Sequence, residues 1–199
     1  REVISIEELK EWYQKLLDEY HKWLSYQKKW KEERNHSLQS LEFPFFYREG
    51  QRKMVSSVYH AIGASRQIFI QAPTGVGKTM STIFPAVRAV GEGKGETIFY
   101  LTAKTITRTV AQEAFEVLRE KGMKYKVVTI TAKEKLCFMD ETKCDPVHCP
   151  YARGHFDRVN DAVYELWTTK SRYDRETIRE QAEKWQVCPF EMCLDLSLW

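Results

Sequence analysis

A short glycine-rich segment, QAPTGVGKT at residues 71–79, contains the residue types that bind phosphate. It follows an apolar run and precedes a helical pattern, which is the context that a phosphate-binding loop requires. Glycines at this spacing allow a tight turn whose backbone N–H groups converge on phosphate oxygens, and the dipole of the helix that follows favours an anion. Lys78 would contact the β- and γ-phosphates, and the Thr79 hydroxyl would bind Mg²⁺. The segment therefore predicts an ATP site formed by Ala72, Pro73, Thr74, Gly75, Val76, Gly77, Lys78 and Thr79.

The first position of this loop is Ala72, where the general pattern has glycine. The alternative is an incidental Lys-Thr pair after a glycine-rich turn, and the strand-like run before it and the helix after it disfavour that alternative. Nucleotide binding is the strongest functional expectation from the sequence.

Five cysteines form the second chemical feature, at positions 137, 144, 149, 188 and 193. The paired C-x2-C hairpins that zinc ribbons favour are absent. Four thiolates from a loop and a distant helix end could instead enclose a [4Fe-4S] cluster, which tolerates wider ligand spacing. Spacing alone leaves iron–sulfur and zinc about equally favoured, and scattered buried cysteines are a third possibility.

The composition is that of a globular protein, with 43% hydrophobic and 30% charged residues. The net charge of +3 tolerates a polyanionic partner without requiring one. The sequence has neither an apolar run long enough to cross a bilayer nor a secretory signal, so we expect a cytoplasmic protein without a membrane partner. Thiols stay reduced in that compartment, which favours metal ligation over disulfides.

Hydrophobic periodicity predicts the elements that must position these residues. One long helix is expected over residues 1–35, with a capping box at Ser5 and Glu8; we interpret it as a packing helix or a spacer rather than a partner-binding helix. Further helices are expected at 50–62, 78–90 and 106–121, and two more after the clustered cysteines, the second with Asp174 as its N-cap. Strands are expected at 66–71, 97–102 and 126–131.

Strands that alternate with helices predict an α/β fold with a parallel sheet and right-handed crossovers. We expect three regions: an N-terminal helical extension at 1–42, the first half of a nucleotide-binding domain at 43–132, and a mainly helical cysteine module at 133–199.

The phosphate loop, the segment LTAKTITRT and four cysteines ending in Cys-Pro-aromatic together resemble the XPD/DinG-type iron–sulfur DNA helicases of superfamily 2. The arrangement is most similar to the bacterial branch that joins a nuclease-like domain to the helicase. The resemblance covers about residues 43–199. It implies a partial RecA-like domain with an inserted iron–sulfur module, and 5′-to-3′ unwinding of DNA in repair or replication, with single-stranded and forked DNA as partners.

The resemblance also implies roles for individual residues. Arg48 and Gln51 match the region that recognises adenine, and Lys104 and Thr105 match a segment that contacts the DNA backbone. The cluster ligands would be Cys137, Cys144, Cys149 and Cys188, which leaves Cys193 as the spare. Lys133 stands where the family often has arginine, so it keeps the charge and loses the planar fork. The module would act as a wedge, and Lys133, Lys135, Lys143, Arg153 and Arg158 would follow the phosphate backbone as a group.

A P-loop ATPase also needs an acidic residue at the end of a neighbouring strand, and no Asp-Glu pair here follows a strand-like run. We therefore expect the carboxylates to lie beyond Trp199 and this segment to bind ATP without hydrolysing it alone. The alternative function is a non-motor P-loop protein with a structural zinc site for protein interaction. A third possibility is a P-loop kinase or transporter ATPase, and the segment TAKTITRT and the cysteine insertion argue against it.

Overall fold

In the computed structural model, residues 3–103 and 105–198 are described. In chain order the elements are α1 (Ile6–Gln39), α2 (Gln51–Gly63), α3 (Lys78–Gly91), α4 (Thr105–Glu120), β1 (Val127–Val128), α5 (Lys133–Leu136), α6 (His155–Thr169), β2 (Arg172–Tyr173), α7 (Arg175–Trp185) and α8 (Pro189–Ser197). The fold separates into two compact units, residues 27–125 and residues 1–26 with 126–199. Within the described ranges, no helix combines the length and apolar character of a membrane span.

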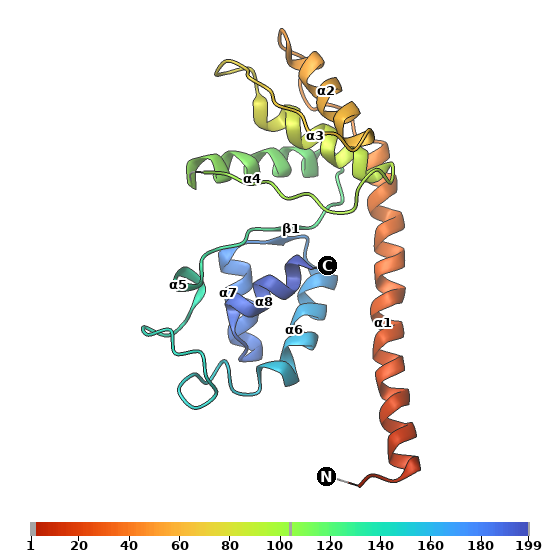
Figure 1. Cartoon of the computed structure of the whole chain (residues 1–199), viewed down its shortest axis with the longest axis vertical. Coiled ribbons are helices and arrows are strands. Elements are labelled where there is room, and N and C mark those ends of the chain that lie inside the picture. Colours follow the sequence, from red (N-terminus) through yellow and green to blue (C-terminus); the bar gives the residue numbers. More distant parts are fainter. Residues whose placement is uncertain (1–2, 104, 199) are drawn as a thin grey trace. The chain divides into compact units, whose positions relative to one another are not determined.

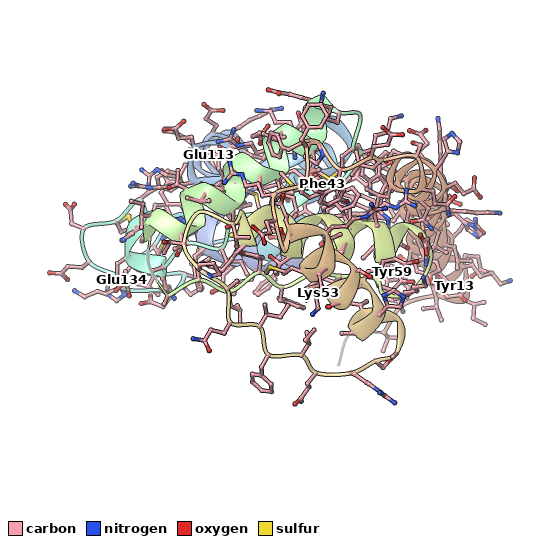
Figure 2. The ribbon with its side chains drawn as sticks, turned by 90° about the horizontal axis from the view of Figure 1, so that it is seen from above. Tyr13, Phe43, Lys53, Tyr59, Glu113 and Glu134 are labelled. Atoms are coloured by element: carbon pink, nitrogen blue, oxygen red, sulfur yellow. The ribbon has the colours of Figure 1, made fainter. Side chains whose placement is uncertain are left out.

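The long helix α1 begins at the predicted capping box. The Ser5 N–H donates to Glu8 Oε2 at 2.7 Å, and the Glu8 N–H donates to Ser5 Oγ at 3.2 Å, so the two residues satisfy each other's open donors. Of the two interpretations, a packing helix or a spacer, the first turns of α1 fit the spacer. There the apolar positions Leu9, Trp12, Leu16 and Tyr20 are between 47% and 59% exposed, and the neighbouring Tyr13 is also exposed and is labelled in Figure 2.

In the unit of residues 27–125, α2 packs against α3 and α3 packs against α4 (Figure 1). Ile83 and Val87 of α3 and Leu118 of α4 are almost completely buried. Leu38, near the end of α1, packs so closely on Gly91 that a Cβ added to the glycine would lie 2.5 Å from the leucine Cβ. The predicted helices at 50–62, 78–90 and 106–121 are therefore confirmed to within one residue at each end.

The strands predicted at 66–71 and 97–102 are wrong. Both segments are irregular, and Phe69 and Leu101 are 94% and 89% exposed. Figure 2 shows the segment that joins α2 to α3 running clear of both helices. A strand forms only where a neighbouring strand accepts its backbone hydrogen bonds, and the described residues of this unit contain no such neighbour. Their β-forming composition alone is not enough.

The second unit contains a parallel pair of strands, but only its first strand falls in a predicted strand and its partner was not predicted. Val127 and Val128 of β1 pair with Arg172 and Tyr173 of β2, and these four residues form the two-stranded sheet of the described chain. Of the predicted strand at 126–131, only β1 forms.

Helices α6, α7 and α8 pack together in the same unit (Figure 1). Val163 of α6 and Ile178 and Ala182 of α7 are buried. Asp174 caps α7 as predicted, because its Oδ1 accepts from the Thr177 N–H at 3.0 Å. Helix α8 was not among the predicted helices, although Pro189 at its first position is a helix-start signal.

Lys126, directly before β1, binds the C-terminal end of α6. Its ammonium donates to the carbonyl oxygen of Trp167, to the Tyr173 hydroxyl at 3.2 Å and to the Tyr26 hydroxyl at 3.3 Å. It also lies 5.1 Å from the Trp167 ring centroid and 5.4 Å from that of Tyr26. A cation at a helix C-terminus and above aromatic rings is favourable, so Lys126 joins α1, α6 and β2 within this unit.

We expect Lys126 to give the unfolding free energy a pH dependence of defined sign. Burial lowers the pKa of Lys126 from 10.5 to about 8. Between these values the unfolded chain retains a proton that the folded chain has released, so the unfolding free energy rises with pH in this window. Lys126→Met should remove that part of the rise, as measured by urea unfolding across the window. Lys121→Met, at an exposed position, is the control, and an unchanged slope in Lys126→Met would contradict the assignment.

Candidate functional site

The candidate phosphate loop has the predicted turn and the predicted helix after it, but the strand predicted before it, at 66–71, does not form. Residues 71–77 form an irregular turn, in which Gly75 and Gly77 have φ values of 82° and 80°. Helix α3 begins at Lys78, with Gly77 as its N-cap residue and no side chain capping it. The first N–H groups of α3 and the positive end of its dipole therefore remain available to an anion.

Lys78 closes this loop on itself. Its Nζ donates to the carbonyl oxygens of Pro73 at 2.8 Å and of Ala72 at 3.2 Å, although the side chain is exposed. These acceptors are neutral, and phosphate oxygens are charged acceptors that form stronger hydrogen bonds with an ammonium group. The loop thus holds Lys78 close to where a bound phosphate would need it.

Arg48 and Gln51, which precede the loop by twenty residues or more, contact it directly. Arg48 Nη1 donates to the Gly75 carbonyl oxygen. Gln51 is 4% exposed, and its Oε1 accepts from the Arg48 N–H at 3.0 Å. Its Nε2 lies so close to Gly77 that a Cβ added there would be 2.5 Å away. The family resemblance implies that both residues lie near the adenine, and no sequence signal indicated that they contact the phosphate loop.

The structure describes most of the other site residues predicted in this unit. Thr79 is the second residue of α3 and is half-buried, and Thr74 and Val76 lie in the turn of the loop. Lys104 lies outside the described residues, and Thr105 is the first residue of α4. The contact of Lys104 and Thr105 with DNA remains a prediction.

In the other unit, the four cysteines predicted as ligands line one pocket. Its lining consists of Lys133, Cys137, Phe138, Met139, Thr142, Lys143, Cys144, Cys149, Tyr151, Ala152, Cys188, Pro189 and Phe190. The empty volume is about 390 Å³, open solvent included. Cys193 is absent from this lining and fully buried beside Met192. The fold thus separates Cys188 from Cys193, which the sequence spacing alone could not do.

The thiols of this cysteine pocket are free, and among the described residues no three potential ligands are close enough together to hold one metal ion. Burial raises the pKa of Cys188, whereas the backbone N–H groups of Glu191 and Phe190 act to lower it. A hydrogen bond with Cys144 raises the pKa of Lys133, and the Lys133 ammonium lies 5.4 Å from the Phe190 ring centroid. The Lys133 ammonium therefore lies near the thiols of Cys144 and Cys188.

Two arginines predicted to follow a phosphate backbone bind backbone carbonyls instead. Arg153 Nε donates to Pro146 O at 2.9 Å, and Arg158 donates to Trp185 O at 3.0 Å and to Gln186 O at 2.6 Å. Of the predicted basic group, Lys133, Lys135 and Lys143 remain as candidates for contact with a polyanion. No sequence signal pointed to Arg153 or Arg158 as supports of the loops.

Comparison with known proteins gives one family and one relative. The sequence pattern of the DEAD/DEAH box helicases matches residues 48–151, just over half of the chain. A probable ATP-dependent helicase of Methanocaldococcus jannaschii is 29% identical over 123 residues, which cover 60% of this chain and 18% of the relative. The chain thus spans less than a fifth of that relative's length. No solved structure is similar enough to count as a match.

The two loop glycines offer a matched test of the contact with Gln51. Both have positive φ, so alanine at either should cost about 1–2 kcal/mol of unfolding free energy. At Gly75 a Cβ would meet nothing within 4 Å, whereas at Gly77 it would meet Gln51 Nε2. We expect Gly77→Ala to be the more destabilising change in urea unfolding, and the extra cost to disappear in a Gln51→Ala background. Equal costs in the parental background would show that Gln51 does not support the loop.

Proposed function

Since the chain belongs to the DEAD/DEAH box helicase family, we propose that it is the part of an ATP-dependent DNA helicase that binds ATP and carries an iron–sulfur module of the XPD/DinG type. An ATP-dependent helicase in general is supported by the family and by the description of the relative. DNA as the substrate, 5′-to-3′ polarity, a role in repair or replication and a neighbouring nuclease-like domain rest on the resemblance described above. The three-region organisation at 1–42, 43–132 and 133–199 belongs to the same proposal.

The phosphate loop is the observation that carries the ATP assignment. Lys78 exchanges the carbonyl oxygens of Ala72 and Pro73 for the β- and γ-phosphates, while the N–H groups at the start of α3 bind the remaining oxygens. The Thr79 hydroxyl would hold Mg²⁺, which would neutralise charge on the phosphates. Arg48 and Gln51 keep the turn in place, and in the family resemblance they also recognise adenine.

The cysteine pocket supports the iron–sulfur assignment. Cys137, Cys144, Cys149 and Cys188 come from separate segments and reach one pocket with apolar and aromatic walls. This donor set suits a [4Fe-4S] cluster, which four thiolates hold. When bound, the cluster would tie these segments together covalently, which a small module with little core needs for rigidity. Lys133 lies beside the thiols, where its positive charge favours thiolates.

In this proposal the lysines of the cysteine module contact DNA, and its arginines hold the loops. Lys133 and Lys135 on α5 and Lys143 in the following loop would contact phosphates, together with Lys104 and Thr105. Arg153 and Arg158 would support the loops rather than bind DNA, since their guanidinium groups already bind carbonyls.

Lys78→Ala should lower the affinity for ATP by about tenfold or more, because it removes charged hydrogen bonds to two phosphates. Calorimetric titration of ATP with Mg²⁺ measures the effect. Lys53→Ala is a matched control, because Lys53 is an exposed lysine on α2 of the same unit (Figure 2). Equal affinity in Lys78→Ala and Lys53→Ala would refute the assignment of the phosphate loop.

The fourth cluster ligand is tested by two alanine variants after anaerobic reconstitution with iron and sulfide. We expect Cys188→Ala to lose bound iron and its visible absorbance, and Cys193→Ala to retain both, because only Cys188 lines the pocket. The reverse outcome would make Cys193 the ligand. A colourless parental protein that carries zinc would instead support a non-motor P-loop protein with a structural zinc site.

A further inference from the structure

The backbone at two of the four pocket cysteines is held by side chains from outside the pocket lining. These side chains are Arg179 of α7 and His155 of α6. Neither stood out in the sequence, because neither lies near a cysteine in a recognisable spacing. Both belong to the same compact unit as the pocket.

Arg179 holds the segment that carries Cys137. Its Nη1 donates to the carbonyl oxygens of Leu136 at 2.7 Å and of Cys137 at 3.1 Å. Its guanidinium also packs over the ring of the next residue, with Cζ 4.4 Å from the Phe138 centroid. These carbonyls belong to the last residue and the C-cap residue of α5, where helical partners run out. One charged, planar side chain therefore fixes both the position and the direction of the chain at Cys137.

His155 holds the segment that carries Cys188. It is the first residue of α6, only 4% exposed, and its Nδ1 accepts from the Cys188 N–H at 3.2 Å. An Nδ1 that accepts requires the tautomer with its proton on Nε2. Cys188 is also the N-cap residue of α8, and its own carbonyl accepts from the Met192 N–H at 3.0 Å. Both the N–H and the carbonyl of Cys188 are thus hydrogen-bonded, so the fold fixes the direction of its side chain.

Cys144 provides the contrast within the same pocket. It is exposed and lies in a segment without helix or strand. Its described contact is with the side chain of Lys133. For Cys144 the structure describes no backbone support of the kind that Cys137 and Cys188 have.

We propose that Arg179 and His155 are positioning residues that hold Cys137 and Cys188 at the pocket before any metal group binds. Two corners of the site are therefore preformed, whereas among the described residues no side chain of this kind holds the backbone at Cys144. The identity of the bound group rests on the proposed function, whereas the preformed positions of the two thiols do not.

The first test uses the metal-free 199-residue chain and measures the rate at which iodoacetamide alkylates each cysteine, by mass spectrometry. Arg179→Met should raise the rate at Cys137 by about tenfold, on the scale of one lost hydrogen bond to a charged donor, and leave Cys188 at the parental rate. Arg175→Met, at an exposed position on the same helix, is the control. Equal rates at Cys137 in these two variants would overturn the role of Arg179.

A conservative pair tests the histidine. His155→Asn retains an acceptor close to the position of Nδ1, and His155→Leu retains the apolar volume without an acceptor. We expect the Cys188 alkylation rate to rise in His155→Leu and to stay near the parental rate in His155→Asn. Equal effects of the two substitutions would reduce His155 to a packing residue and overturn its positioning role.

The second test is iron uptake during reconstitution with limiting iron and sulfide. Arg179→Met and His155→Leu should take up less iron than the parent, while Arg175→Met and His155→Asn match it. Parental uptake in all four variants would overturn the proposal.

If Arg179→Met proves unfolded by circular dichroism, Arg179→Lys replaces it. Arg179→Lys should give an intermediate alkylation rate at Cys137, because it keeps the charge and loses the planar fork of the guanidinium. A parent that takes up no iron would refute the iron–sulfur assignment alone, since the alkylation rates are measured without metal.

Discussion

Backbone carbonyl oxygens outside regular structure need hydrogen-bond donors, and in this protein cationic side chains supply many of them. Arg48 binds Gly75 in the phosphate loop, Arg179 binds the backbone at Cys137, and Lys126 binds the end of α6. A charged donor makes a stronger hydrogen bond than a neutral one, so few side chains fix long irregular segments. The candidate functional residues lie on such segments, and their positions depend on this pairing more than on a sheet.

This use of charge changes how the basic composition should be interpreted. The chain contains 31 lysines and arginines, but a guanidinium that binds carbonyls is no longer free to contact a polyanion. Arg153 and Arg158 are examples in the cysteine module. Lys78 also donates to neutral carbonyls, but its single ammonium on a flexible stem can exchange them for the charged phosphates of a nucleotide. Arg158 differs because its guanidinium binds three carbonyls at once.

The features that the sequence predicted well are those whose cause is local. The capping boundaries at Ser5 and Asp174 and the start of α3 after Gly77 depend on residues within one helical turn. The predicted strands at 66–71 and 97–102 failed because a strand depends on partners far away in the sequence. The pocket cysteines were predicted as a set through the family resemblance. The side chains that hold their backbone, such as Arg179, could not be predicted, because they depend on which loop packs against which helix. Sequence spacing contains no information on that contact.

The exposed segments at 66–71 and 97–102 also affect how this chain behaves at high concentration. They combine β-branched and aromatic residues with unpaired backbone groups, and Phe69 and Leu101 are almost fully exposed. Such segments act as templates for intermolecular β-pairing, the first step of aggregation. The segment at 66–71 has one charged side chain, Arg66, and the segment at 97–102 has none, so little charge repulsion opposes that pairing. Colloidal stability of the isolated chain is therefore limited by these two segments and not by the well-packed helices beside them.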